Sequence, residues 1–360
     1  MSLTVSPRVL ALWSVVFVSL AAGCGTDAVT PNNPPLDAAV TDTGASPDVP
    51  GTSDTGVPTP EDVAVADAGV ADAGAPPVMS SSCDTLRAGT VDGFMVGGLS
   101  RQFILTLPTG ATAPGGRWPV VFNWHGLGDT AQNMNQLLAG AVNNATMPFI
   151  LVTPESTHLG PTTVPLGIEW DNIQVREPNR EAQLFDAVLR CVGERWGVDA
   201  DRVYTVGFSA GAIMSDLLGV LRGDRLAGIV SYSGAYFSNA PNRATLGGVG
   251  NLIQWPATPV PSRYAQLMLS GGTMDLFSLV VAQAHFDQFA ANDSPYLRAS
   301  GHDVIYCTHG RGHTVPSGVM APQLVEFFAA HPRTVMASPW AAGLPMSYPS
   351  YCTFQARGGS

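Results

Sequence analysis

Short strand-like runs alternate with longer helix-like stretches from residue 103 onward, and this alternation limits the fold more than any other feature. Strands joined through helices pair in parallel, and a parallel sheet needs helices on both faces. The pattern therefore predicts an α/β fold, with a mostly parallel central sheet covered on both faces, within one domain over 80–360. The expected strands are Phe103 to Leu107, Val120 to Trp124, Phe149 to Thr153, Val203 to Val206, Gly228 to Tyr232, Ala265 to Ser270 and Val304 to Cys307. The expected helices are Ala131 to Ala139, Arg180 to Trp196, Ala212 to Leu221, Leu276 to Phe289 and Gln323 to Ala330.

A Gly-x-Ser-x-Gly pentapeptide, Gly207 to Gly211, lies between an expected strand and the next expected helix. The two glycines allow a tight turn that projects the serine hydroxyl outward. The N–H of Ala210, at the start of the helix, is free to stabilise an oxyanion. Ser209 is thus the predicted nucleophile, and the alternative is a capping or buried serine in a Gly-rich turn.

An acid and a base follow two later strands, which places them at the carboxyl edge where α/β enzymes gather their active sites. Asp275 could accept the imidazole Nδ1–H, and His313 could take the Ser209 proton. The chain order nucleophile, acid, base is that of α/β-hydrolases. Asp275 could instead cap the expected helix that follows it. Weaker candidates are Asp287, Asp293 and Asp303 for the acid and His309 for the base.

A second loop, His125-Gly126-Leu127-Gly128, follows the strand that ends at Trp124. Glycines on both sides of Leu127 would let its N–H face a substrate oxygen and complete an oxyanion hole with Ala210. His125 is interpreted as a structural residue that fixes this loop, because it precedes the nucleophile and does not follow the acid.

The four loops together resemble the α/β-hydrolase branch that holds secreted poly(3-hydroxybutyrate) depolymerases and feruloyl and acetylxylan esterases. The matching motifs are His125-Gly126, Gly207 to Gly211, Gly272 to Asp275 and Gly312 to Pro316, and the resemblance spans nearly all of residues 95–332. It implies an α/β-hydrolase fold and a serine carboxylic-ester hydrolase that works through an acyl-enzyme on Ser209, without a cofactor.

The same resemblance implies feruloyl or acetyl esters of polysaccharides, or polyhydroxyalkanoate-type polyesters, as substrates. Two departures bear on the subfamily: Ser270-Gly271 stands where His-Gly often precedes the acid motif, and Leu127-Gly128 follows His-Gly. Trp170 and Tyr236, and also Trp255, could offer the substrate a stacking surface or could pack in the hydrophobic core. A serine peptidase on the same fold and a non-catalytic surface-binding lipoprotein are the alternative functions.

The first 24 residues read as an export signal: Arg8 precedes an apolar run that ends in Ala21-Ala22-Gly23-Cys24. The last five, Leu20 to Cys24, resemble a bacterial lipobox. This predicts lipidation of Cys24 and an outer-membrane or cell-surface location, with the lipid as the link to the membrane. Ordinary secretion after cleavage near Ala22 is the alternative.

Residues 25–79 read as a disordered acidic tether, because 25–78 hold no aromatic residue and no Arg or Lys. Nine of the 28 acidic residues fall there, which leaves 16 Arg against 19 acids in the rest of the mature chain. With no basic excess in the folded part, nucleic acid is not an expected partner.

Four cysteines remain after Cys24, and an even number in an exported domain predicts two disulfides. Three pairings are possible, and the sequence does not choose among them. No metal site is expected, because no two of these cysteines have the short spacing of zinc ligands. The disulfide candidates are Cys83, Cys191, Cys307 and Cys352.

Overall fold

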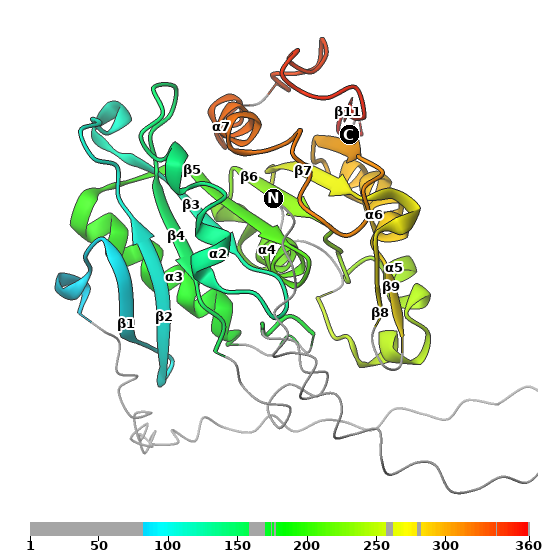
Figure 1. Cartoon of the computed structure of the whole chain (residues 1–360), viewed down its shortest axis with the longest axis horizontal. Helices are drawn as coiled ribbons and strands as arrows, with labels where there is room; N and C mark the ends of the chain where they lie inside the picture. Colours follow the sequence, from blue (N-terminus) through cyan, green and yellow to red (C-terminus); the bar gives the residue numbers. More distant parts are fainter. Residues whose placement is uncertain are drawn as a thin grey trace, which may run out of the picture. The chain divides into compact units, whose positions relative to one another are not determined.

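A computed structural model describes residues 82–157, 170–173, 175, 178–256, 262–278, 282–335 and 337–358 (Figure 1). These residues belong to one compact unit. The predicted signal, the predicted lipidation site Cys24 and the predicted tether lie outside the described residues. Within the described part, no helix combines the length and apolarity that a membrane span requires.

A nine-stranded sheet runs through the domain in the order β1-β2-β4-β3-β5-β6-β7-β10-β11. The six strands from β4 to β10 in that order are parallel, whereas β1, β2 and β11 pair antiparallel with their neighbours. The predicted mostly parallel sheet is thereby confirmed. The strands are β1 (Gly89–Val96), β2 (Leu99–Thr106), β3 (Trp118–Trp124), β4 (Ile150–Pro154), β5 (Val198–Phe208), β6 (Gly228–Tyr232), β7 (Ala265–Ser270), β10 (Val304–Thr308) and β11 (Cys352–Gln355).

Helices cover both faces of this sheet, as predicted (Figure 1). Successive strand residues point to opposite faces, so Phe122 joins the core under α3, α4 and α6, whereas Val121 joins the core under α2 and α7. The helices are α2 (Ala131–Asn135), α3 (Arg180–Trp196), α4 (Ala210–Arg222), α5 (Ala240–Thr245), α6 (Phe286–Ala299) and α7 (Ala321–Ala330). Short 3₁₀ turns are η1 (Cys83–Thr85), η2 (Pro114–Gly116), η3 (Ala139–Ala141), η4 (Gly223–Arg225), η5 (Gly247–Leu252) and η6 (Gly272–Met274).

The helix predicted over Leu276 to Phe289 is wrong in its first part. Instead, β8 (Leu276–Ser278) and β9 (Gln283–His285) form a two-stranded antiparallel sheet, and α6 begins at Phe286. The register places Phe277 opposite Ala284. Both side chains pack on the core shared with α4 and α6, so tertiary packing overrides the helical pattern here. The edge strands β1 and β11 and the short helix α5 were not predicted.

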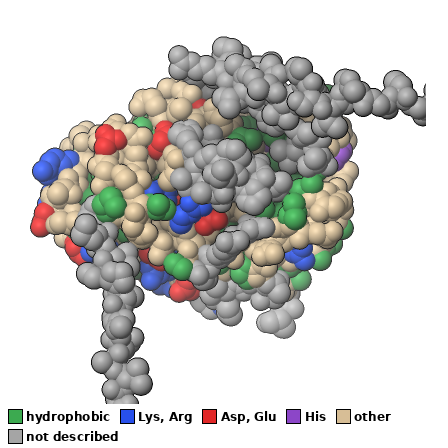
Figure 2. Space-filling model, turned by 90° about the horizontal axis from the view of Figure 1, so that it is seen from below, with side chains coloured by type: hydrophobic (Ala, Val, Ile, Leu, Met, Phe, Trp, Pro, Cys, Tyr) green, Lys and Arg blue, Asp and Glu red, His purple; other side chains and the backbone are tan. Residues whose placement is uncertain are grey.

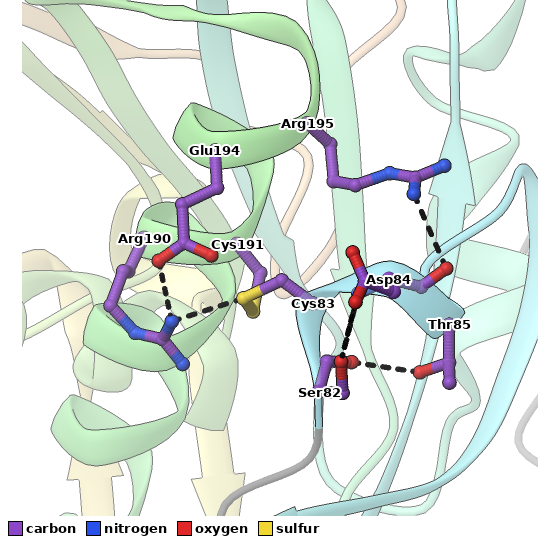
Figure 3. Close-up of a disulfide and its surroundings, with 8 residues drawn as sticks. All are labelled: Ser82, Cys83, Asp84, Thr85, Arg190, Cys191, Glu194 and Arg195. Carbon is purple, nitrogen blue, oxygen red and sulfur yellow. Dashed lines mark hydrogen bonds and ion pairs between the residues drawn. A yellow bond between two sulfur atoms is a disulfide. The ribbon is translucent and has the colours of Figure 1, made fainter.

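Two disulfides link segments near the two ends of the described domain to its helices and strands. Cys83 pairs with Cys191 and ties η1 to the middle of α3 (Figure 3). Around this bond, Arg190 reaches both the Cys83 sulfur, at 3.0 Å, and Glu194, at 2.6 Å. Cys307 pairs with Cys352 and ties β10 to β11, where the two residues are also register partners.

Charged side chains are dispersed over the face of the molecule seen in Figure 2. Arginine and acidic side chains alternate there, and among the residues that are coloured neither sign gathers in one place. This matches the small excess of acids over bases in the folded part of the sequence.

Candidate active site

Ser209 occupies a strained turn between β5 and α4. Its φ of 54° and ψ of −119° are rare for a residue with a side chain, and strain of this kind concentrates at functional sites. The flanking glycines make the turn possible: a Cβ at Gly207 would lie 2.1 Å from the Gly211 oxygen, and one at Gly211 would lie 2.2 Å from the Trp124 oxygen. The Ser209 N–H donates to the Tyr232 oxygen at 2.9 Å, which ties the turn to the end of β6.

A continuous chain of hydrogen bonds joins the predicted nucleophile, base and acid. The Nε2 atom of His313 lies 2.9 Å from the Ser209 hydroxyl, and its Nδ1 lies 2.7 Å from Asp275 Oδ1. Asp275 is fully buried, while the His313 side chain is 17% exposed. The imidazole can therefore pass a proton between the serine and a substrate oxygen while the carboxylate fixes its orientation.

Adjacent strands bring the acid and the base together. Asp275 follows β7 and η6, and His313 follows β10, the parallel neighbour of β7. Their loops touch through glycine: the Gly312 N–H donates to the Gly271 oxygen, and a Cβ at Gly271 would lie 2.0 Å from the Gly312 oxygen.

The carboxylate of Asp275 has further donors besides His313. The Gly271 N–H donates to its Oδ2 at 2.7 Å, and the Ser233 hydroxyl is within hydrogen-bond distance of both its oxygens. Ser233 is buried and has a φ of 57°, the second non-glycine residue with positive φ in the described part. The sequence did not predict this residue; its signal was only its position one residue after the strand next to β7.

The alternative acids and base have other partners. Asp293 accepts from the Tyr236 N–H and from two asparagine side chains, and Asp303 pairs with Arg357. Burial alone would raise the pKa of Asp303, but its hydrogen bonds to Arg357 and the arginine charge lower that pKa overall. Asp287 lies in the first turn of α6.

The alternative base also has a partner of its own. The pKa of His309 is lowered by burial, and its Nδ1 accepts the N–H of Arg311.

Asp275 does not cap the start of a following helix, because strand β8 follows it directly. Of the predicted candidates for acid and base, Asp275 and His313 are the two that hydrogen bonds join to Ser209 in the structure.

The predicted oxyanion donors Leu127 and Ala210 line the same pocket as Ser209. His125 is fully buried in the loop before Leu127 and contacts the Gly126 oxygen at 2.8 Å through Nδ1. Its Nε2 meets the Ser156 N–H at 3.1 Å and Glu155 Oε1 at 3.0 Å. These contacts hold the loop in place.

The two predicted substrate-contact residues lie in the core. Trp170 is fully buried, and its indole N–H donates to the His125 oxygen at 3.0 Å. Tyr236 is also fully buried, and its hydroxyl donates to Gln266 at 2.8 Å. Neither is among the residues that line the pocket at Ser209, and Trp255 is not either.

Three phenylalanines surround the imidazole of His313. The ring of Phe286 stacks on it with centroids 4.7 Å apart, and those of Phe208 and Phe277 lie at 4.9 and 6.0 Å. These apolar rings restrict both the tilt of the imidazole and the access of water to it. Over the ranges that the structure describes, no group of three or more His, Cys, Asp or Glu residues is arranged to hold a metal ion.

The chain is similar in sequence to known proteins. Residues 117–249 match the family described as Phospholipase/Carboxylesterase. Feruloyl esterase D of Neurospora crassa is 28% identical over 167 residues, which make up 44% of this chain and 55% of the relative. This chain thus spans about half the length of that curated relative.

Solved structures share the fold. A pOPH variant in complex with DMSO matches with a TM-score of 0.61 at 16% identity, over 79% of this chain and 97% of that one. Native sOPH matches with a TM-score of 0.57 at 19% identity, over 79% and 98% of the two chains. With the family match, these likenesses confirm the fold class predicted from the sequence.

Proposed function

We propose that this chain, an α/β-hydrolase related to the carboxylesterases, is a serine carboxylic-ester hydrolase whose catalytic triad is Ser209, His313 and Asp275. The observation that carries the proposal is the hydrogen-bonded chain from the Ser209 hydroxyl through the imidazole to a buried carboxylate. The positive φ of Ser209 and its place at the start of α4 support the role of nucleophile.

The proposed reaction has two steps. In the first, the Ser209 oxygen attacks the ester carbonyl while His313 takes the hydroxyl proton, and the N–H groups of Leu127 and Ala210 stabilise the oxyanion. The C–O bond to the alcohol then breaks, and His313 returns the proton to the departing alkoxide. In the second step, His313 activates a water that attacks the acyl-enzyme, which releases the acid and restores the serine.

Three ester classes are the candidate substrates: feruloyl esters and acetyl esters of polysaccharides, and polyhydroxyalkanoate-type polyesters. The likeness to a feruloyl esterase supports the first class. No cofactor takes part in this mechanism.

The proposed location is outside the cytoplasm, at the outer membrane or cell surface through a lipid on Cys24. Two disulfides in one domain support export, because such bonds persist in oxidising compartments. Membrane fractionation of Cys24→Ala tests the anchor: the variant should move to the soluble fraction, and its retention with the membrane contradicts a lipid at this cysteine.

A fluorophosphonate probe tests the triad. Wild-type protein should be labelled and should hydrolyse p-nitrophenyl esters, and Ser209→Ala and His313→Ala should lose labelling and at least about 10⁴-fold in kcat. His309→Ala, which removes the alternative base, and Ser300→Ala, an exposed serine at the end of α6, are the matched controls and should keep activity. Labelling that survives in His313→Ala but fails in His309→Ala would mean that His309, and not His313, is the base. No labelling of folded wild-type protein would refute the proposed function.

A further inference from the structure

A pocket of about 70 Å³ adjoins the Ser209 hydroxyl. Its walls come from α4, from the segment that follows β6, and from β8 and β9 with the start of α6, and include Ile213, Phe237, Ile253 and Phe289. Among the described residues that line it, Ser209 has the one polar side chain. Apart from the Ser209 hydroxyl, the described side chains around a group bound there are therefore hydrocarbon.

Polar side chains next to the pocket wall have partners elsewhere. Phe237 lies between Tyr236 and Ser238; the Tyr236 hydroxyl donates to Gln266, and the Ser238 hydroxyl accepts from Tyr296. Ser233, at the base of the same segment, donates to Asp275. A hydroxyl group brought in by a substrate would lose its water and would find no partner among these side chains.

The position of the pocket relative to the triad indicates which half of an ester it takes. The departing alcohol oxygen must reach Nε2 of His313 to receive its proton. The pocket is lined by Ser209 and by both proposed oxyanion donors, Leu127 and Ala210, but His313 is not among the described lining residues. A carbonyl held by these two donors, with its alcohol oxygen at Nε2 of His313, would place the acyl group in the pocket.

The volume sets the size of that acyl group. One water-sized group needs roughly 10–15 Å³ of such a cavity, so 70 Å³ holds about five to seven of them. An acetyl group would leave most of this space empty. A feruloyl group exceeds it and brings a phenol hydroxyl and a methoxy oxygen, and a 3-hydroxybutyryl group brings an oxygen at its third carbon.

We infer that this pocket binds the acyl group and selects esters of unsubstituted aliphatic acids, of about four to six carbons, over acetyl, hydroxylated and phenolic acyl groups. The inference rests on the proposed ester hydrolysis, and it favours a fourth acyl class over the three candidate substrate classes given above. Each buried methylene contributes about fourfold to kcat/KM, and an unpartnered hydroxyl in an apolar pocket costs up to about 100-fold.

The test compares p-nitrophenyl esters that share one alcohol and differ in acyl group, using the whole chain with its disulfides intact. Butyrate and hexanoate should exceed acetate in kcat/KM by about tenfold or more. Butyrate should exceed 3-hydroxybutyrate, its matched hydroxylated analogue, by at least about tenfold, and methyl butyrate should exceed methyl ferulate. Equal or better turnover of the hydroxylated or feruloyl ester overturns the inference.

Two variants alter the pocket, and one control does not. Ala284→Leu fills it from β9 and should lower the butyrate-to-acetate ratio about tenfold; Ile253→Ala widens it and should move the preference to longer chains. Leu252→Ala changes an exposed neighbour of Ile253 outside the pocket and should keep the wild-type ratios. Unchanged ratios in both pocket variants would overturn the inference. Labelling by fluorophosphonate in the same preparations separates a wrong acyl preference from failure of the ester-hydrolase proposal itself, since the label requires only an active Ser209.

Discussion

The hydroxyl of Ser233 lies 3.0 Å from Oδ1 and 2.8 Å from Oδ2 of Asp275, so one donor is shared by both oxygens of the buried carboxylate. Ser233→Ala removes that donor and should lower kcat about tenfold or more with little change in KM, because the bond orients the acid and does not touch substrate. Steady-state kinetics on p-nitrophenyl butyrate measure the separate changes in kcat and KM. A variant that raises KM and keeps kcat contradicts this role.

Ser233→Gly is the companion variant. It also lacks the hydroxyl but relieves the positive φ of this position. Both variants should therefore lose the same activity. The free energy of unfolding of the glycine variant should be about 1 kcal/mol higher than that of the alanine variant. If activity follows stability across the pair, the serine supports the backbone and not the carboxylate.

Gly207→Ala should destroy the strained turn at Ser209. The added Cβ would meet the backbone oxygen of Gly211 at 2.1 Å, and a backbone atom cannot move aside as a flexible side chain can. We expect a loss of about 2–4 kcal/mol in the free energy of unfolding and no fluorophosphonate labelling. Gly140→Ala, where nothing lies within 4 Å of the added carbon, should change stability by less than about 1 kcal/mol. Urea denaturation of the two variants and wild type gives the comparison; equal stabilities would show that the turn can relax.

Replacing both Cys307 and Cys352 by alanine should lower stability by about 2–5 kcal/mol, because the bond closes a loop with a sequence separation of 45. Since β10 leads directly into the loop that carries His313, activity should be lost at a lower temperature as well. Thermal inactivation of the double variant, measured beside wild type with both disulfides intact, checks this. Identical inactivation with and without the bond would mean that the disulfide is dispensable for the histidine loop.

Acid should destabilise the fold through His302. Burial lowers the pKa of this histidine to about 4, and its Nδ1 contacts the Tyr264 oxygen at 2.9 Å. The unfolded chain binds a proton below pH ~6.5 that the folded chain does not, so stability is complete above that pH and falls as the pH drops toward 4. The loss reaches about 3 kcal/mol at most. The pKa of His331 is also lowered to about 4 by burial, and this histidine acts in the same direction.

The pH prediction needs a variant for its test, because the pKa of buried Asp216 is raised to about 7 by desolvation and gives the opposite slope. His302→Asn keeps an N–H donor near the Nδ1 position but does not titrate. The free energy of unfolding should fall less steeply from pH 6.5 to 4 in this variant than in wild type, while the contributions of other groups cancel. Parallel curves for the two proteins would refute the assignment to His302.

Much of this domain was predictable because local and global signals agree. The predicted apolar runs overlap the strands from β2 to β10 in the main sheet, although β2 and β5 begin earlier, at Leu99 and Val198. Helix α3 begins and ends at the predicted residues Arg180 and Trp196. The turn at Ser209 was predictable for a steric reason: the glycines before and after it are positions where any side chain would collide with backbone.

Other features depend on contacts between segments far apart in the sequence. The β8–β9 pair forms because Phe277 and Ala284 find a shared core, which no local period reveals. Ser233 becomes a partner of Asp275 only once β6 and β7 lie side by side. The residues that line the pocket have apolar side chains of the kind that also fills a core. The sequence therefore did not distinguish them from core residues, and only the cavity between them in the structure does.

The disulfide between Cys83 and Cys191 also has a mechanical consequence. The 81 residues that precede Ser82 connect to the domain one residue before this bond. Tension along that leading segment would pass from Cys83 into α3 through a covalent link, and the edge hydrogen bonds of β1 would be spared the load. Force applied at the N-terminal end would thus bypass the first strand, because shearing β1 from the sheet would require breaking a sulfur–sulfur bond first.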